Sequence, residues 1–149
     1  MPISEICTRE VAVADRAMTI LEAAQAMRKQ HAGNLVVVEE QNGKRVPVGI
    51  VTDRDIVVSV VATKLDPSIF TVGDLVMQKL TTCQEDEGIL ECVRRMRIKG
   101  IRRMPVVDSD GSLVGIVTVD DIVQMLAEEM NAIGKLIARE QVEEAVHKR

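Results

Sequence analysis

The sequence predicts a mixed α/β (α+β) fold made of two pseudo-symmetric repeats, each with the element order β-α-β-β-α, packed together as one module. Two observations carry this prediction. The stretch GIVTDRDIV at 49–57 returns as GIVTVDDIV at 115–123, with seven of nine positions identical. The stretch ILEAAQAM at 20–27 returns as ILECVRRM at 89–96. Internal similarity of this kind indicates one structural unit used twice.

The ILE stretches predict the first helix of each repeat. Four apolar residues of the first copy recur at the spacing of one helix face: Ile20, Ala23, Ala24 and Met27. Residues 89–96 repeat that face. Thr19 and Glu22 have the spacing of a capping box, which places the start of the first helix at Thr19.

Three strands are expected in each repeat. Short opening strands precede the helices, near 11–13 and 80–82, and apolar runs at 33–38 and 102–107 follow them. The GIVT stretches supply the third strand, and the acidic residues behind them suit the N-terminus of a second helix.

Turn residues join the second and third strands. Asn42-Gly43 and Asp110-Gly111 tolerate the positive φ angles of tight hairpins. Pro47 and Pro105 lie in or beside strands, so we expect those strands to be edges or to begin at the proline.

The repeats divide the chain into four segments. The expected boundaries are a first repeat at 1–66, a linker at 67–75, a second repeat at 76–130 and a helical tail at 131–149. Each repeat would be marginally stable alone, so the pair is the expected folding unit.

Composition limits the class of protein. The chain has 149 residues, of which 46% are apolar and 28% charged, with a formal net charge of −4, as in ordinary globular domains. No apolar run is long enough to span a bilayer and no signal peptide is visible, which favours a cytoplasmic protein without membrane contact. Cys7, Cys83 and Cys92 lack metal-ligand spacing and are expected to be reduced, buried or half-buried thiols. With no Trp, no Tyr and a single Phe, a planar ligand would have to be held by aliphatic side chains.

Each GIVT strand ends in a Thr-x-x-Asp motif, formed by Thr52 with Asp55 and by Thr118 with Asp121. A carboxylate accepts the hydroxyl donors of a ribose, and a threonine hydroxyl both donates and accepts. The helix N-terminus behind the motif favours phosphate. A structural interpretation also fits, because Asp commonly caps helices and Thr favours strands.

The order and spacing of these motifs resemble the CBS domain, a module first described in cystathionine β-synthase. The motifs are the helix ILE-x-x-x-x-M, the strand MPVVD, the turn DG and the strand GIVT with its Thr-x-x-Asp-Ile exit. Two copies in tandem are similar to a CBS pair, or Bateman module. The resemblance covers about residues 5–130 and leaves no catalytic domain outside it, so a stand-alone CBS pair without enzyme activity is expected.

The resemblance implies a regulatory function. CBS pairs bind adenosine-containing ligands (AMP, ADP, ATP or S-adenosylmethionine) in clefts between the repeats and report occupancy to a regulated protein, here unidentified, by a conformational change. The ligand is regulatory, and no obligatory cofactor is implied. In the family pattern the ribose and phosphate contacts fall on Thr52, Asp55, Thr118 and Asp121. Family members associate through their helices, so a homodimer with a contribution from the apolar face of the tail is expected.

Further site candidates come from the strands. Adenine would lie between aliphatic walls, for which the candidates are Ile50, Ile116, Val13 and Thr82; the same residues also fit an ordinary core.

The stretch RRMRIKGIRR at 94–103 contains six basic residues. Most of them, including Arg95, fit the solvated face of a helix. Arg102 and Arg103 directly precede a strand, where the resemblance implies a phosphate contact, and their counterparts are the uncharged Gly33 and Asn34. The arginine-bearing side is therefore expected to prefer phosphates, and the other side a nucleoside-like ligand or weak binding.

Two alternatives stay open. A protein- or RNA-interaction scaffold would use 94–103 and leave the clefts unoccupied, although the net acidity and the lack of aromatic platforms make nucleic acid unlikely. A metal-dependent phosphohydrolase would use the paired acids of the two motifs. Acids are expected at helix starts in any case, no nucleophile or Ser-His-Asp arrangement is visible, and we assign neither catalytic nor metal residues.

Overall fold

The computed structural model describes residues 1–76 and 79–147. The first repeat consists of β1 (Val13–Ala14), α1 (Ile20–Gln30), β2 (Asn34–Gln41), β3 (Lys44–Thr52), α2 (Asp53–Ile56) and its π-helical continuation η2 (Val57–Val61). The second repeat consists of β4 (Cys83–Gln84), α4 (Ile89–Lys99), β5 (Arg103–Val107), β6 (Leu113–Thr118) and α5 (Val119–His147). A short helix precedes each repeat, η1 (Ile3–Glu5) and α3 (Val72–Leu75). The predicted β-α-β-β-α order is confirmed in both repeats.

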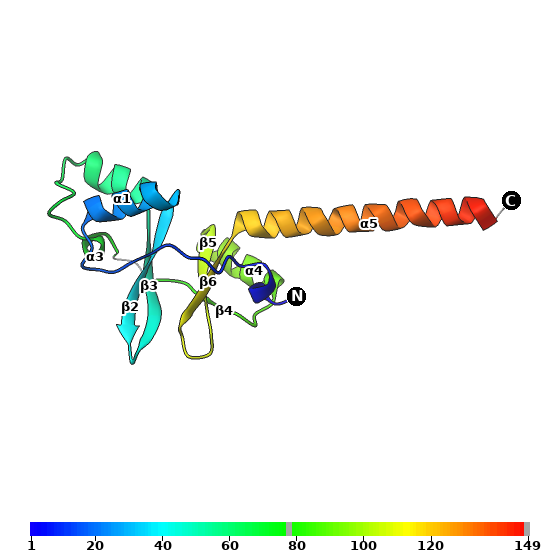
Figure 1. Cartoon of the computed structure of the whole chain (residues 1–149), viewed down its shortest axis with the longest axis horizontal. Helices are drawn as coiled ribbons and strands as arrows, with labels where there is room; N and C mark the ends of the chain where they lie inside the picture. The colour runs from blue at the N-terminus through cyan, green and yellow to red at the C-terminus, as the bar shows by residue number, and fades with distance from the viewer. Residues whose placement is uncertain (77–78, 148–149) are drawn as a thin grey trace.

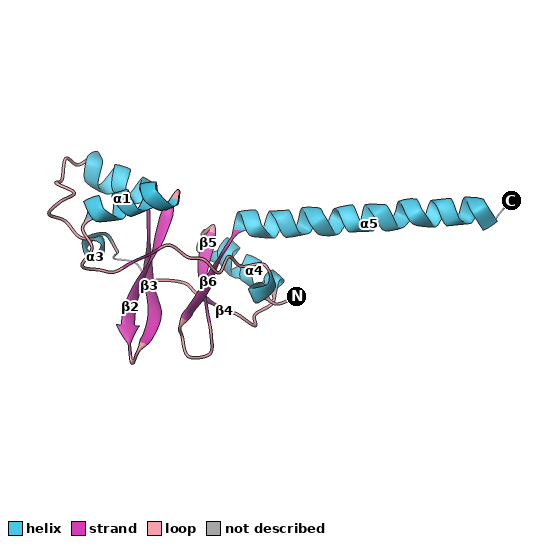
Figure 2. Cartoon of the chain, in the orientation of Figure 1, coloured by secondary structure: helices cyan, strands magenta, loops and turns pink. Residues whose placement is uncertain are grey.

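The strands form two small sheets, ordered β1-β2-β3 and β4-β5-β6. In each sheet the opening strand pairs in parallel with the middle strand, and the other two strands form an antiparallel hairpin. The sheets stand next to each other, between α1 and α3 on one side and α4 and α5 on the other (Figure 2). Strand β3 of the first sheet contacts β6 of the second, so the two GIVT strands form the seam between the repeats.

The first hairpin has the predicted turn. Asn42 and Gly43 have φ angles of 53° and 76° and connect Gln41 directly to Lys44, as in a type I′ turn. The opening strands begin two and three residues later than predicted, because only Val13–Ala14 and Cys83–Gln84 pair with a neighbour.

The two prolines differ in position. Pro47 lies in β3, an edge strand, as predicted. Pro105 lies in β5, the middle strand, so the edge prediction is wrong there. Its partner Ile116 directs both its N–H and its carbonyl toward Thr8, and β4 pairs only with Val106 and Val107. The missing N–H of Pro105 therefore leaves no ladder bond unmade.

The repeats exchange the segments that precede them. Val72, from the segment predicted as a linker, is buried in the core of the first repeat, and Ile3 is buried in the core of the second. Backbone bonds fix both segments, from Val72 N–H to the Met18 carbonyl and from Ile3 N–H to the Glu87 carbonyl, each at 2.8 Å. The packing units thus differ from the sequence segments 1–66 and 76–130, and the N-terminus lies beside α4 (Figure 1).

Close approach explains the glycine of both GIVT strands. A Cβ atom on Gly49 would lie 2.1 Å from Val76 Cγ1, and one on Gly115 would lie 2.8 Å from both Cys7 Sγ and the Thr8 carbonyl oxygen. In each case the exchanged segment lies directly over the strand of the other repeat.

Helix α5 continues through the predicted tail boundary at 131 and projects away from the two repeats (Figure 1). Ile122 is its buried residue, Met125 is half-buried against the core of the second repeat, and the large apolar residues from Leu126 onward are exposed in the single chain. Among the described residues no helix combines the length and hydrophobicity that a membrane span requires.

Gly115→Ala tests the close approach at the seam. The added methyl group meets a backbone oxygen that cannot move without shifting the exchanged segment, so we expect a loss of about 1–3 kcal/mol in the free energy of unfolding. Gly134→Ala is the matched control, because a methyl group added at this position of α5 would meet nothing within 4 Å and alanine favours helices. Urea denaturation measures both; equal stability of the Gly115→Ala variant and the parent would contradict the packing described.

Candidate functional site between the two repeats

The larger of two clefts between the repeats, the first cleft, has a volume of about 670 Å³. Both repeats and the segment between them line it: Gly49, Ile50, Thr52, Asp55, Ser59, Leu75, Val76, Lys79, Leu80, Thr81, Ile101, Arg102 and Arg103. Volumes of this size are typical of small-molecule sites. The lining joins an apolar wall to hydroxyl groups, one carboxylate and three cationic side chains.

Thr52 and Asp55 form a reciprocal cap at the start of α2. Asp55 N–H donates to Thr52 Oγ1 at 3.1 Å, and Thr52 N–H donates to Asp55 Oδ2 at 2.9 Å. The structural interpretation of the motif is therefore correct. It does not exclude ligand contact, since the cap uses one carboxylate oxygen and Oδ1 has no hydrogen-bond partner among the described residues.

The same cap recurs elsewhere in the chain. In the second repeat Asp121 N–H donates to Thr118 Oγ1 at 3.2 Å, and Thr118 N–H donates to Asp121 Oδ2 at 2.9 Å. Before α3, Thr71 N–H donates to Asp74 Oδ2 at 2.9 Å. Thr71 and Asp74 line neither cleft, so the motif alone marks a helix start and its position decides whether it faces a cavity.

Arg102 and Arg103 line the first cleft together with Thr52 and Asp55 of the other repeat. From the sequence, the two arginines could be assigned only to the second repeat. In the structure they line the same cleft as the Thr-x-x-Asp motif of the first repeat. Arg102 Nη2 lies 3.7 Å from Asp120 Oδ1, and both side chains are mostly exposed, so this pair is weak. Arg103 is half-buried and has no ion pair within 1–76 or 79–147.

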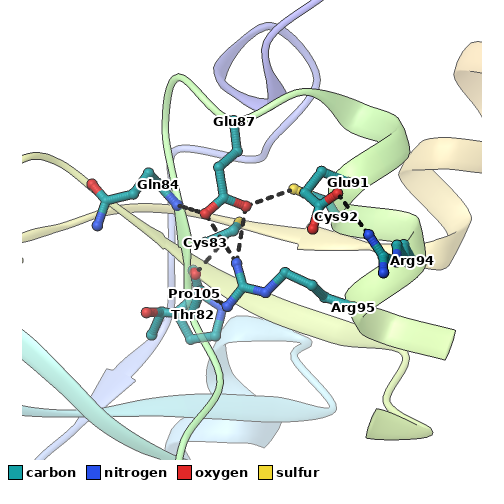
Figure 3. A network of polar contacts seen from close by, with 9 residues as sticks. All are labelled: Thr82, Cys83, Gln84, Glu87, Glu91, Cys92, Arg94, Arg95 and Pro105. Atoms are coloured by element: carbon teal, nitrogen blue, oxygen red, sulfur yellow. Dashed lines mark hydrogen bonds and ion pairs between the residues drawn. The ribbon is translucent and has the colours of Figure 1, made fainter. Parts of the chain in front are cut away.

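Arg95 has a structural role, which corrects its assignment to a solvated face. Its Nη1 lies 3.0 and 2.9 Å from the two carboxylate oxygens of Glu87, and Nη2 donates to the Thr82 carbonyl (Figure 3). Glu87 also accepts from Gln84 N–H at 3.3 Å. This network ties α4 to the start of β4, so Arg95 is not free to bind a ligand.

Two buried cysteines lie beside this network. Cys83 Sγ lies 3.8 Å from the Pro105 carbonyl oxygen and Cys92 Sγ lies 3.7 Å from Glu87 Oε2 (Figure 3). Burial raises the pKa of both thiols, and also that of half-buried Cys7. In the described part of the chain no three His, Cys, Asp or Glu side chains converge as a metal-ligand set would.

The second cleft, of about 440 Å³, lies on the other side of the seam. Its lining residues are Glu10, Val11, Ala12, Gln30, Ala32, Asn34 and Ile116. Thr118 and Asp121 do not line it; Asp121 lines a separate acidic hollow of about 360 Å³ beside Met1 and Glu5. The N-terminal segment runs from this hollow to the second cleft, and Thr8 pairs with Ile116 on the way, with both N···O distances at 2.9 Å.

The ten predicted site residues are thus unequally placed. Ile50, Thr52, Asp55, Arg102 and Arg103 line the first cleft, and Ile116 lines the second. Thr118, Asp121, Val13 and Thr82 line neither.

Sequence reasoning missed several lining residues. Leu80 and Thr81 stand directly before Thr82, in the segment that leads into β4, so the predicted residue lies one position beyond the lining. Lys79 corresponds to Glu10, because the first halves of the two repeats are offset by 69 residues. This change of charge between the repeats is visible in the sequence.

Comparison with known proteins identifies the family. The CBS domain model matches residues 3–62 and 72–128. An uncharacterized protein of Methanopyrus kandleri is 39% identical over 123 residues, which is 83% of this chain and 61% of that protein. The chain thus spans less than two thirds of that relative. The chain belongs to the CBS domain family, with two CBS domains that form a pair.

Two solved structures share the fold of the pair. A CBS domain protein from Pyrobaculum aerophilum, complexed with AMP, has a TM-score of 0.72 at 28% identity and covers 81% of this chain and 89% of its own. A CBS domain pair in complex with 5′-methylthioadenosine and S-adenosyl-L-methionine has a TM-score of 0.73 at 29% identity, covering 87% of this chain and 98% of its own. Both of these proteins bind adenosine-containing ligands.

Proposed function

We propose that this chain is a non-catalytic sensor that binds an adenosine phosphate in the first cleft and reports its occupancy to a regulated protein. One observation carries the proposal: the first cleft joins the Thr52–Asp55 motif of one repeat to Lys79, Arg102 and Arg103 from the chain beyond it. A ribose carrying phosphate needs both an acceptor pair for its hydroxyls and cations for its phosphate oxygens.

Each side chain has a distinct role in this proposal. Asp55 Oδ1 accepts from the ribose hydroxyls, while Oδ2 stays in the cap that fixes the carboxylate. The guanidinium of Arg103 binds phosphate oxygens, with Arg102 and Lys79 adding positive charge. Adenine lies between the aliphatic side chains of the lining, Ile50, Leu80 and Ile101.

The signal follows from the composition of the cleft. A ligand held by Asp55 on one repeat and Arg103 on the other favours the arrangement that brings both within reach, since its binding free energy depends on both. The shift is transmitted along the seam between β3 and β6, where the repeats meet. Relatives that bind AMP, 5′-methylthioadenosine or S-adenosyl-L-methionine support this ligand class.

The scaffold alternative has less support. It requires the basic stretch 94–103 as a free surface, but Arg95 is engaged by Glu87 and Arg103 faces the first cleft. A steep loss of binding with salt would identify an RNA complex.

We also propose that the chain forms a homodimer through α5. Five exposed apolar residues recur at alternating spacings of three and four: Val123, Leu126, Met130, Ile133 and Ile137. This spacing creates an apolar stripe that a second copy of the same helix covers. The helix projects too far from the repeats for its own chain to cover the stripe (Figure 1).

Ile133→Asp tests the dimer. A carboxylate at the centre of the apolar stripe on α5 cannot be desolvated without a partner. We therefore expect sedimentation equilibrium to give the mass of two chains for the parent and of one chain for the variant. Lys135→Asp, on the same helix but outside the apolar stripe, should leave the dimer intact. A monomeric parent at about 100 μM would contradict the proposal.

Asp55→Asn tests the ligand site. The asparagine carbonyl still accepts from Thr52 N–H, so the cap survives, but an amide replaces part of the acceptor that the ribose needs. Hydrogen bonds to charged groups contribute about 1.5–3 kcal/mol, so we expect ATP and AMP to bind about 10- to 100-fold more weakly in equilibrium dialysis.

Asp74→Asn is the matched control. It alters the same capping motif where no cleft exists, so it should match Asp55→Asn in thermal stability and the parent in affinity. Parent-like affinity of the Asp55→Asn variant would refute the assignment of the site.

A further inference from the structure

The two clefts are related by the internal repeat, yet they carry opposite charge. The uncharged lining positions correspond closely: Val11 with Leu80, Ala12 with Thr81, Ala32 with Ile101, and Ile116 with Ile50. Six residues of the second lining thus have a counterpart in the first, whereas Thr118 and Asp121, the counterparts of Thr52 and Asp55, do not line the second cleft. Among the shared positions, a difference in ligand must come from those that differ in charge.

The charged side chains of the two linings differ at three pairs of corresponding positions. Lys79 in the first cleft corresponds to Glu10 in the second, and Arg103 corresponds to Asn34. Arg102 corresponds to Gly33, which has no side chain to offer. The described lining of the first cleft thus has three cations and one carboxylate, whereas that of the second has one carboxylate and no cation.

We propose that the second cleft binds a nucleoside without phosphate and rejects nucleoside phosphates, an inference that rests on the proposed function of the first cleft. A phosphate in the second cleft would meet the carboxylate of Glu10 and no cation to offset it. The uncharged amides of Gln30 and Asn34 suit the edge of a base, since a carboxamide donates and accepts at once.

The volumes agree with this division. The second cleft, at about 440 Å³, is smaller than the first, at about 670 Å³, as expected where no phosphate group has to be housed. Glu10 is exposed and Asn34 half-buried, so both can be exchanged without disturbing a core. The chain would then read two compounds of different charge, a phosphate on one side of the seam and a nucleoside on the other.

Calorimetric titration of the full chain with ATP and with adenosine tests the proposal. We expect one ATP per chain, and one further adenosine per chain when ATP is saturating. In the double variant Glu10→Lys, Asn34→Arg a second ATP should bind, at least 10-fold more tightly than any second ATP in the parent. In the reverse variant Lys79→Glu, Arg103→Asn the ATP affinity should fall at least 10-fold while adenosine still binds to the second cleft.

Each outcome separates the two proposals. Two ATP per parent chain, or no adenosine bound beside saturating ATP, overturns the assignment of the second cleft and leaves the proposed function of the first intact. Adenosine binding beside ATP that the Glu10→Lys, Asn34→Arg variant retains at parental affinity, with no second ATP, also overturns it. If neither compound binds at millimolar concentration, the proposed function itself fails, and the second-cleft proposal fails with it.

Discussion

The structure depends on the contact between the two GIVT strands and on the segments that cross them. Gly49 lies under Val76 and Gly115 under Cys7 and Thr8, with no room for a side chain at either glycine. Because the crossing segments are exchanged between the repeats, each core is completed by residues from the other half of the sequence. Neither repeat is closed without its partner, and both clefts exist only because the repeats are held together in this way.

The Thr-x-x-Asp motif acts as a helix cap in both repeats, and the proposed ligand contact at Asp55 is compatible with that role. In each repeat the threonine and the aspartate form reciprocal hydrogen bonds that cap α2 or α5. These bonds orient the carboxylate instead of blocking it, because one oxygen is fixed and the other points away from the cap. The further copy at Thr71 and Asp74 forms the same bond away from the clefts, so the motif alone does not mark a cavity.

The fold could be predicted because its signals occur twice and are local. Helix periodicity, the Thr19 cap, the Asn42-Gly43 turn and the order of elements all follow from neighbouring residues. Long-range packing could not be predicted: Ile3 and Val72 look like ordinary apolar residues, and nothing local shows that they exchange cores. For the same reason Arg103 and the Thr52–Asp55 motif could each be singled out from the sequence, but their position in one cleft could not. Arg95 looked solvated because its partner, Glu87, lies outside the helix on which the arginine was placed.

In the proposed complex the ligand contacts both repeats at once in the first cleft. Amide NMR of the ¹⁵N-labelled chain during titration with AMP tests this arrangement. We expect the signals of Thr52 and Asp55 on one repeat and of Thr81 and Arg103 on the other to shift together along one saturation curve. Shifts confined to one repeat, or an unchanged spectrum at millimolar AMP, ADP and ATP, would contradict it.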